Sequence, residues 1–506
     1  KEPIMWTLFY AMLSLVNRSH IMEALFLSVS VSITITILDL ILAFPIAWKV
    51  VRTQFRGKNL VNAIIESPLA VPTAGLGFSV ALFWGITPGI TKPFGAIGLF
   101  SNVYLMLVLF HFTTTFSYAV RALSAILETI DPDYETAAIV CGASHFSAIR
   151  TVTLPMTRPG IATAAVLCLA KSFSDTGGVM AVLAALNTLQ LNGTALIGTR
   201  KGEYRSATDP MLKEILLAEL ALVSVFMILI ALFFLILSKI LFLKINIKIR
   251  KVWPHWERKI SSSRTSRISN GIAFSFLMFF VLIPSFFIFS FVLTSKTQTD
   301  INWGSLFRAM GLSIFIASAA TFLNLVLGVP LAIWIHKRQD HFLGRFMDQL
   351  ADIPYIVPSA ALGFSISLFW PETIFVPEIV LVVLAHTSMT FPFIVRNVMG
   401  GLQTIDPSLE ETARTLGARP FQAFSRVTFP IIWPSILAGA IMAFTRSIGE
   451  TGATLAVSPD TTTAPKLIVD LIAENNYFYA SLATILLIFF TSVAIFLTRV
   501  LQRTRK

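Results

Sequence analysis

The chain has 506 residues, of which 55% are hydrophobic and 13% are charged, and its mean hydropathy is +0.76. Soluble domains carry roughly 25% charged residues, so a soluble protein of this composition could not cover its apolar core. The net charge of +12 is concentrated in short segments beside apolar runs, which favours basic cytoplasmic loops over nucleic-acid binding. The two cysteines, Cys141 and Cys168, show no disulfide or metal-ligand spacing.

Apolar segments long enough to cross roughly 30 Å of hydrocarbon recur along the chain. The first half, 1–243, has five of them, and the second half, 271–506, has six because one additional segment precedes it. A basic linker, 244–270, separates the two halves. The expected membrane spans are 21–48, 60–84, 103–123, 160–185, 215–243, 272–293, 306–335, 353–370, 379–399, 431–453 and 479–501.

One polar stretch, 127–160, recurs at 402–435 with a constant offset of 275 residues, and 15 of its 34 positions are identical. The similarity extends further, since PLAVPTAGLGF from Pro68 parallels PYIVPSAALGF from Pro354. This pattern indicates a tandem duplication. We therefore expect an all-α polytopic membrane protein of two parallel repeats, each of five to six transmembrane helices, related by a pseudo-two-fold axis along the membrane normal.

The basic linker sets the expected orientation, because lysine and arginine collect in cytoplasmic loops. If 244–270 is cytoplasmic, alternation of the spans places both copies of the polar stretch in the cytoplasm as well. The first half lacks a counterpart of 272–293, which puts residue 1 outside. We therefore expect about one further span before Lys1, with eleven spans visible and twelve in the intact chain.

Each copy of the polar stretch predicts a helix, a glycine turn and a second short helix. Asp131-Pro132 and Asp406-Pro407 are good helix starts, because aspartate caps free backbone amides and proline suits the first helical position. Gly142 and Gly417 permit a positive φ at the turn. The product is a compact element that can seat in a groove of a cytoplasmic partner. An amphipathic loop lying on the membrane is the alternative, and the matched duplication disfavours it.

The repeated stretch resembles the cytoplasmic loop of ABC importer permeases of bacteria and archaea, whose pattern is E-A-A, three residues, G, nine residues, I-x-L-P. The second copy has Glu411-Thr412-Ala413 followed by Gly417 at the required spacing. The first copy has Ala137 and Ala138, but Thr136 stands at the acidic position. The resemblance implies that both loops dock on ATP-hydrolysing subunits, through Glu135, Ala137, Ala138, Gly142, Phe146, Pro155, Glu410, Glu411, Ala413, Gly417, Phe421 and Pro430.

The same resemblance implies the partners and the location. The chain would form the translocation pathway of an importer in the cytoplasmic membrane of a bacterium or archaeon. It would work with two copies of an ABC ATPase subunit and an extracytoplasmic substrate-binding protein. No G-x-x-x-x-G-K-[ST] phosphate loop is present, so ATP and Mg²⁺ are expected in the partner, and this chain is not expected to be an enzyme. No cofactor, metal or nucleic acid is expected.

Two resemblances bear on the cargo. Fusion of two permease halves resembles the ferric-iron and thiamine branches of the family. RSIGETGATL, from Arg446, is similar to a run in molybdate and sulfate permeases, although Thr451 stands where an aromatic residue is usual. The expected cargo is a small ion, either an oxyanion such as molybdate, sulfate or a phosphonate, or ferric iron. A thiamine or polyamine permease and an ion-coupled secondary transporter remain the alternatives.

Charged residues inside predicted spans are the candidates for the transport pathway, because buried charge is costly and usually faces a cavity or a partner. Lys171 and Asp175 are four residues apart, as are Arg446 and Glu450, so the charges of each pair can also neutralise one another on a helix. Proline and glycine breaks in the equivalent spans 60–84 and 353–370 either line the pathway or pack as kinks. The candidates are Lys171, Asp175, Arg446 and Glu450, together with Pro72, Gly77, Pro358 and Gly363. His111 and His386 begin matching spans on the outer side and are expected to be hydrogen-bonded interfacial histidines rather than metal ligands.

Overall fold

A computed structural model describes residues 19–85, 102–244, 271–295, 301–370, 376–406 and 408–503. Within these ranges every regular element is a helix. Seven helices are long and apolar enough to cross a membrane, three bent helix pairs qualify as single spans, and Tyr477–Val493 is a shorter apolar helix. The described residues thus hold seven candidate spans, or ten if each bent pair crosses the membrane once, and the last of the eleven predicted spans, 479–501, corresponds to the shorter helix. The linker 244–270 lies outside the described residues, apart from Lys244.

The first half begins with long helices and ends with α12. Its elements are α2 (Ser19–Arg52), α3 (Lys58–Glu66), a 3₁₀ turn (Ser67–Ala70), α4 (Thr73–Trp84), α5 (Val103–Thr129), α6 (Asp133–Val140), α7 (His145–Ala148), a π-helical turn (Ile149–Thr153), α8 (Leu154–Met156), α9 (Arg158–Ser174), α10 (Gly177–Ala185), α11 (Gly193–Ser206) and α12 (Pro210–Lys244).

The second half repeats this order after one added span. Its elements are the span Gly271–Thr294, which ends in α15 (Ile283–Thr294), then α16 (Trp303–His336), α17 (Phe342–Ile356), α18 (Ser359–Phe369), α19 (Glu378–Gln403), α20 (Ser408–Thr415), α21 (Pro420–Ala423), a π-helical turn (Phe424–Thr428), α22 (Phe429–Ile448), α23 (Gly452–Val457), α24 (Ala464–Ala473) and α25 (Tyr477–Arg503).

Equivalent helices of the two halves pack in equivalent ways. Helix α2 packs along α5, and α16 packs along α19. Inside the first pair Thr115 donates a hydrogen bond to the buried Asp39. Inside the second pair Asn324 Nδ2 donates to Thr390 Oγ1 at 2.7 Å. An amide and a carboxylate therefore fill the same place in the two repeats, so the fold does not require a charge there.

The equivalent spans 60–84 and 353–370 are each sharply bent, as their prolines and glycines predict. The helix axis changes direction by 107° at the break in the first half and by 109° at the break in the second. Pro72 and Pro358 stand immediately before α4 and α18 and act as their N-cap residues. Proline suits a helix start because it has no N–H to satisfy.

The structure also divides two spans that the sequence treats as single segments, 160–185 and 431–453. Helix α9 ends at Ser174 and α10 begins at Gly177, while α22 ends at Ile448 and α23 begins at Gly452. The cause is the glycine-rich sequence after each carboxylate, together with a side-chain cap. Asp175 accepts a hydrogen bond from the Gly178 amide at 3.1 Å, and Glu450 accepts one from the Ala453 amide at 2.9 Å.

The added span of the second half packs mainly on the first half. Ser79 of α4 donates to the Pro284 carbonyl at 2.7 Å, and Phe83 packs edge-on against Phe279 with ring centroids 5.7 Å apart. Phe83 is fully buried, whereas Phe369 at the matching place of the other repeat is 75% exposed. The boundary between the halves along the chain is therefore not their boundary in space.

Candidate functional site

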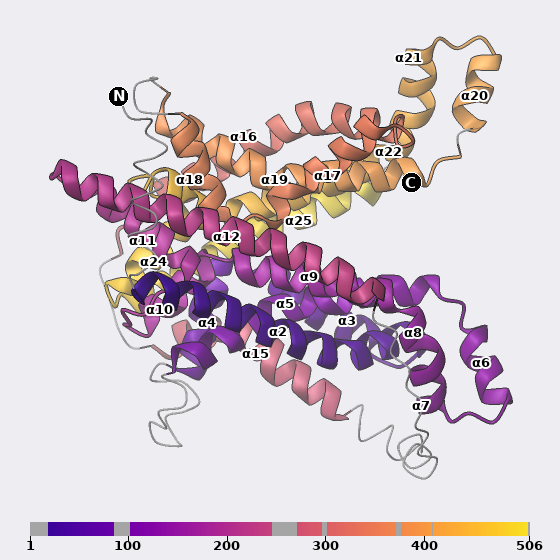
Figure 1. Ribbon diagram of the computed structural model, residues 1–506, viewed down its shortest axis with the longest axis horizontal. Coiled ribbons are helices and arrows are strands. Elements are labelled where there is room, and N and C mark those ends of the chain that lie inside the picture. The colour runs from indigo at the N-terminus through magenta and orange to yellow at the C-terminus, as the bar shows by residue number, and fades with distance from the viewer. Residues whose placement is uncertain are drawn as a thin grey trace.

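Both copies of the repeated loop project from the same end of the molecule (Figure 1). The first copy is α6, α7 and the π-helical turn after them, and the second is α20, α21 and their own π-helical turn. The two π-helical turns keep the 275-residue offset. The first copy then bends by 71° into α9, whereas the second continues into α22 as one helix, Pro420–Ile448. Two similar loops with different connections to the membrane helices thus lie at the same end of the molecule.

The glycine turn of each loop has the predicted backbone conformation. Gly142 and Gly417 both have φ of +94°. The amide after each glycine bonds back across the turn, from Ala143 to the Ala138 carbonyl and from Ala418 to the Ala413 carbonyl, at 3.0 Å in both copies. This pattern is a Schellman motif, which satisfies carbonyls that the end of a helix leaves free.

The aspartate at the start of each loop caps a backbone amide, as predicted. Asp131 accepts a hydrogen bond from the Asp133 amide at 2.9 Å, and Asp406 accepts one from the Ser408 amide at the same distance. The hydrogen bond from Ser408 lowers the pKa of the Asp406 carboxyl below its usual value. Pro407 lies outside the described residues.

Glu135 points into the protein. Its carboxylate accepts hydrogen bonds from Thr153 Oγ1 at 2.7 Å and from Arg52 Nε at 3.2 Å, and Trp48 Nε1 lies 3.3 Å from both oxygens. The equivalent Glu410 accepts a bond from Thr428 Oγ1 at 3.0 Å. Glu135 thus ties the first loop to α2, and Glu410 joins α20 to the π-helical turn of its own loop, whereas Thr136 and Glu411, at the acidic position of the pattern, are exposed.

The remaining loop candidates are mostly at the surface. Ala137, Gly142, Phe146, Glu411, Gly417, Phe421 and Pro430 are exposed, and Ala138, Pro155, Glu410 and Ala413 are half-buried. Sequence reasoning missed further apolar residues that the loops expose, namely Tyr134, Val140, Leu409 and Leu416. Their signal was an apolar residue in an otherwise polar helix. Leu416, Val140 and Phe421 are each about four-fifths exposed, at 84%, 81% and 78%.

The charged candidates form two matching ion pairs at the breaks between helices. Lys171 Nζ lies 2.8 Å from Asp175 Oδ2, and Arg446 pairs with Glu450. Both carboxylates are almost completely buried, at 2% and 3% exposure. Each pair therefore neutralises itself, as its spacing allows.

The two cations nevertheless share one cavity. This cavity has a volume of about 30 Å³ and lies where α5 and α9 of the first half meet α17, α18, α19 and α22 of the second. We call it the central pocket. Its lining residues are Tyr118, Lys171, Ser174, Pro354, Tyr355, Val357, Ser359, Met389, Phe393 and Arg446.

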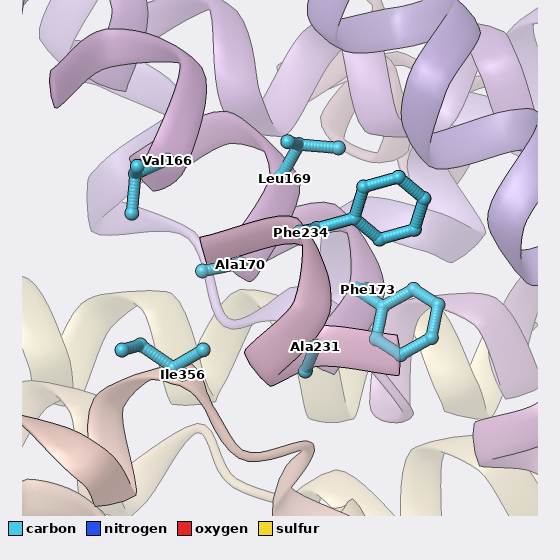
Figure 2. A pocket seen from close by; sticks show the side chains of 7 residues that line it. All are labelled: Val166, Leu169, Ala170, Phe173, Ala231, Phe234 and Ile356. Carbon is cyan, nitrogen blue, oxygen red and sulfur yellow. The ribbon is translucent and has the colours of Figure 1, made fainter. Parts of the chain in front are cut away.

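A second cavity lacks charged and polar lining residues. Figure 2 shows Phe173 and Ala170 of α9, Phe234 and Ala231 of α12 and Ile356 of α17 around it. All its lining side chains are apolar and its volume is about 10 Å³. Water is held only where polar partners exist, so this cavity is a packing gap between helices.

Comparison with known proteins decides the family. The chain matches the family model described as "Binding-protein-dependent transport system inner membrane component" twice, over residues 39–251 and 324–506. The chain belongs to this family. It is thus the permease of a type I ABC importer, built from two fused copies of the family domain.

The matches to three individual relatives cover between 29% and 46% of the permease. It is 33% identical over 240 residues to the molybdate/tungstate transport system permease protein of Pyrococcus furiosus, covering 93% of that protein and 46% of this chain. It is 27% identical over 245 residues to a probable sulfate transport system permease protein of Prototheca wickerhamii, covering 96% of it and 45% of this chain. The sulfate transport system permease protein of Escherichia coli is 37% identical over 162 residues, 56% of its length and 29% of this chain.

Gly77, Gly363 and Pro72 each make a close packing contact in this structure. A Cβ placed on Gly77 would overlap the backbone of Gly178, and one on Gly363 would overlap the backbone of Ala453. These close approaches join α4 to α10 and α18 to α23. Pro72 lies against Gly449, across the boundary between the halves.

The two histidines lie inside the helix bundle. His386 bonds through Nδ1 to Ser447 Oγ at 2.8 Å and through Nε2 to Thr454 Oγ1 at 2.9 Å. His111 is equally buried, at 2% exposure. No group of three or more metal-ligating side chains occurs in the described ranges.

Proposed function

We propose that this permease forms the translocation pathway of an oxyanion importer in the cytoplasmic membrane of a bacterium or archaeon. Two ATP-hydrolysing subunits would bind its two loops, and an extracytoplasmic substrate-binding protein would deliver the cargo at the opposite end. The observation that carries the proposal is the pair of matched loops at one end of a doubled permease domain (Figure 1). The relatives named as sulfate and molybdate/tungstate permeases support the cargo class.

The loops supply the mechanical link. Their exposed apolar side chains would be covered by the ATP-hydrolysing subunits, and the Schellman turns give each loop a defined shape. When ATP draws the two subunits together, the loops move together and carry α9 and α22 with them. ATP must favour one arrangement of the halves over the other by several kcal/mol to switch it, about 5.5 kcal/mol for a change from 1:99 to 99:1.

The chemistry of the central pocket favours an anion over the other cargo classes. Lys171 and Arg446 line it, and no carboxylate is among its described lining residues. Ferric iron, thiamine and polyamines are cationic and would find no carboxylate among these lining residues, whereas an anion would find two cationic hydrogen-bond donors. An ion-coupled secondary transporter has no ATPase to dock, so it gives no account of the matched loops.

The docking proposal is tested by disrupting the second loop. Glu411→Lys combined with Gly417→Pro should abolish co-purification of the ATP-hydrolysing subunit with tagged permease, because the changes reverse an exposed charge and block the positive-φ turn. Glu474→Lys, an exposed charge reversal after α24, is the matched control and should leave the complex intact. An undisturbed complex in the loop variant, seen by size-exclusion chromatography, would refute docking through this loop.

The cargo is tested in proteoliposomes that contain the complete importer. Radiolabelled sulfate and molybdate should accumulate in an ATP-dependent manner, and thiamine, spermidine and ferric citrate should not. Uptake of sulfate or molybdate in the absence of the ATP-hydrolysing subunits would support the secondary-transporter alternative instead. Uptake of only a cationic compound would overturn the oxyanion assignment while leaving the permease assignment in place.

A further inference from the structure

We infer that the central pocket is the transit site of the permease, where Lys171 and Arg446 together bind one tetrahedral dianion. This inference rests on the proposed function, because it gives that oxyanion a binding site within the membrane part of the protein. The two cations occupy equivalent positions of the repeats, 275 residues apart, yet both line the same cavity. A pseudo-two-fold axis that brings two cations together suits a cargo carrying two negative charges.

The other polar groups of the pocket are hydroxyls. Tyr118 and Ser174 come from the first half, and Tyr355 and Ser359 come from the second. A tetrahedral oxyanion presents only acceptors, so it needs N–H and O–H donors on several sides. Ammonium, guanidinium and hydroxyl groups are all donors, and charge-assisted bonds to an oxyanion are stronger than neutral ones.

The carboxylates can release their cations without being left unpaired. Asp175 uses one oxygen for Lys171 and the other for the Gly178 amide, 3.1 Å away. Glu450 likewise uses one oxygen for Arg446 and the other for the Ala453 amide, 2.9 Å away. Each carboxylate thus keeps a backbone donor at a helix start, where negative charge is favoured, when its cation turns to the dianion.

A threonine pair lies next to the pocket-lining Ser359, since a Cβ on Gly452 would lie 2.4 Å from Thr176 Oγ1 and 2.7 Å from Ser359 Oγ. Thr176 and Thr451 are almost fully buried, and their hydroxyls have no hydrogen-bond partner among the described residues. Thr451 lies against Gly177, which follows Thr176, and Thr176 lies against Gly452, which follows Thr451. A Cβ on Gly177 would lie only 2.5 Å from Thr451 Oγ1. Ser359 of the second half also donates a hydrogen bond to the Ser174 carbonyl of the first half, at 3.3 Å.

The pocket is small in this structure, in which the two threonines are in contact with the facing glycines. Its volume of about 30 Å³ has room for about one water, which is less than a five-atom oxyanion needs. Separation of the halves would open the pocket and free the Thr176 and Thr451 hydroxyls for the entering ion. The buried, unpaired hydroxyls then acquire a partner that the closed state lacks.

The inference is tested with variants that remove each charge pair as a unit, so that no buried charge is left alone. Lys171→Gln with Asp175→Asn, and Arg446→Gln with Glu450→Gln, should each lower ATP-dependent uptake of sulfate and molybdate into proteoliposomes by about tenfold or more. The control is Lys466→Gln with Asp470→Asn, which removes another pair of the same spacing, in α24 and outside the pocket. The control should retain uptake to within about twofold.

Two further variants separate binding from folding. Arg446→Lys keeps the charge and should recover most of the uptake lost in the glutamine variants. Tyr118→Phe with Tyr355→Phe keeps the packing and the charges, and should raise the KM for uptake by removing two donors. Wild-type uptake in the charge-pair variants, once size-exclusion chromatography shows the assembled importer, would overturn the inference. If those variants fail to assemble, an unchanged KM in the phenylalanine variant overturns it.

The two levels of the proposal fail differently. If the wild-type importer accumulates neither sulfate nor molybdate, the cargo class is wrong and the inference falls with it. If wild-type uptake is robust and the charge-pair variants match it, only the transit site is wrong.

Discussion

At the scale of single residues, the clearest difference between the repeats is how a glutamate anchors each loop. Glu135 and Glu410 are identical in the repeat, and both bond to the equivalent threonine. Glu135 also pairs with Arg52, whose own Nη2 donates to the Ile130 carbonyl at 2.7 Å. The first loop is therefore tied to α2 as well as to its own π-helical turn.

This anchoring predicts unequal loop stability. Glu135→Ala leaves Arg52 unpaired in a buried setting, and removal of one partner of a buried ion pair costs about 3–5 kcal/mol. Glu410→Ala loses one hydrogen bond to a charged group, about 1.5–3 kcal/mol. Hydrogen exchange of the loop amides, followed by mass spectrometry, should speed up far more in the first variant. Equal acceleration in the two loops would show that Arg52 contributes nothing to the anchor.

The sequence repeat pairs these glutamates but cannot say where they point. The family pattern puts the acidic residue one position later, at Thr136 and Glu411, and those two side chains are the exposed ones. Burial of Glu135 depends on Trp48 and Arg52, which are more than 80 residues away in the chain. Only the packing of α2 against the loop decides its direction.

At the scale of elements, the helix–glycine–helix loop is the part that local sequence specifies best. The aspartate cap, the positive φ and the position of the second helix all follow from residues within the loop. The first helix of each loop ends two residues before the glycine, at Val140 and Thr415. The π-helical turns were not predicted, because they depend on how the loop rejoins the membrane helices.

The glycine turns give a prediction with a matched control. Gly142→Ala and Gly417→Ala meet no neighbouring atoms, so their cost is the left-handed backbone alone, roughly 1–2 kcal/mol. The affinity of the permease for its ATP-hydrolysing subunit should fall by about five- to thirtyfold. Gly400→Ala in α19 is equally open but lacks the positive φ, and it should be neutral or slightly stabilising. An equal loss of affinity in all three variants would show that the positive-φ turn is not the cause.

At the scale of the whole molecule, the two halves are also joined at the end away from the loops. Arg205, at the end of α11, pairs with Glu378 at the start of α19 and lies 3.1 Å from Asp460. Burial lowers the pKa of Arg205, but the two carboxylates outweigh it and raise that pKa above its usual value. The Arg205 cluster and the contact between Thr176 and Thr451 thus both join the two halves on the side away from the loops.

Loosening this outer cluster should shift the permease towards the outward-open state. Arg205→Gln should raise ATP hydrolysis by the complete importer without binding protein, by at most about fivefold because the side chains are partly exposed. Arg121→Gln breaks a comparably exposed pair with Glu66 inside the first half, and it is expected to leave the rate unchanged. A rate in the Arg205 variant at or below that of the control would contradict a closing role.

The sequence alone determined the membrane class, the doubled repeat and the shape of the loops. These features depend on hydrophobic length, internal periodicity and turn chemistry, which are local properties of the chain. Tertiary structure decided the rest. The added span lies on the first half, Glu135 faces inward, and Lys171 and Arg446 meet in one pocket although 275 residues separate them. Such placements depend on which helix faces touch, and no local pattern encodes a contact between distant segments.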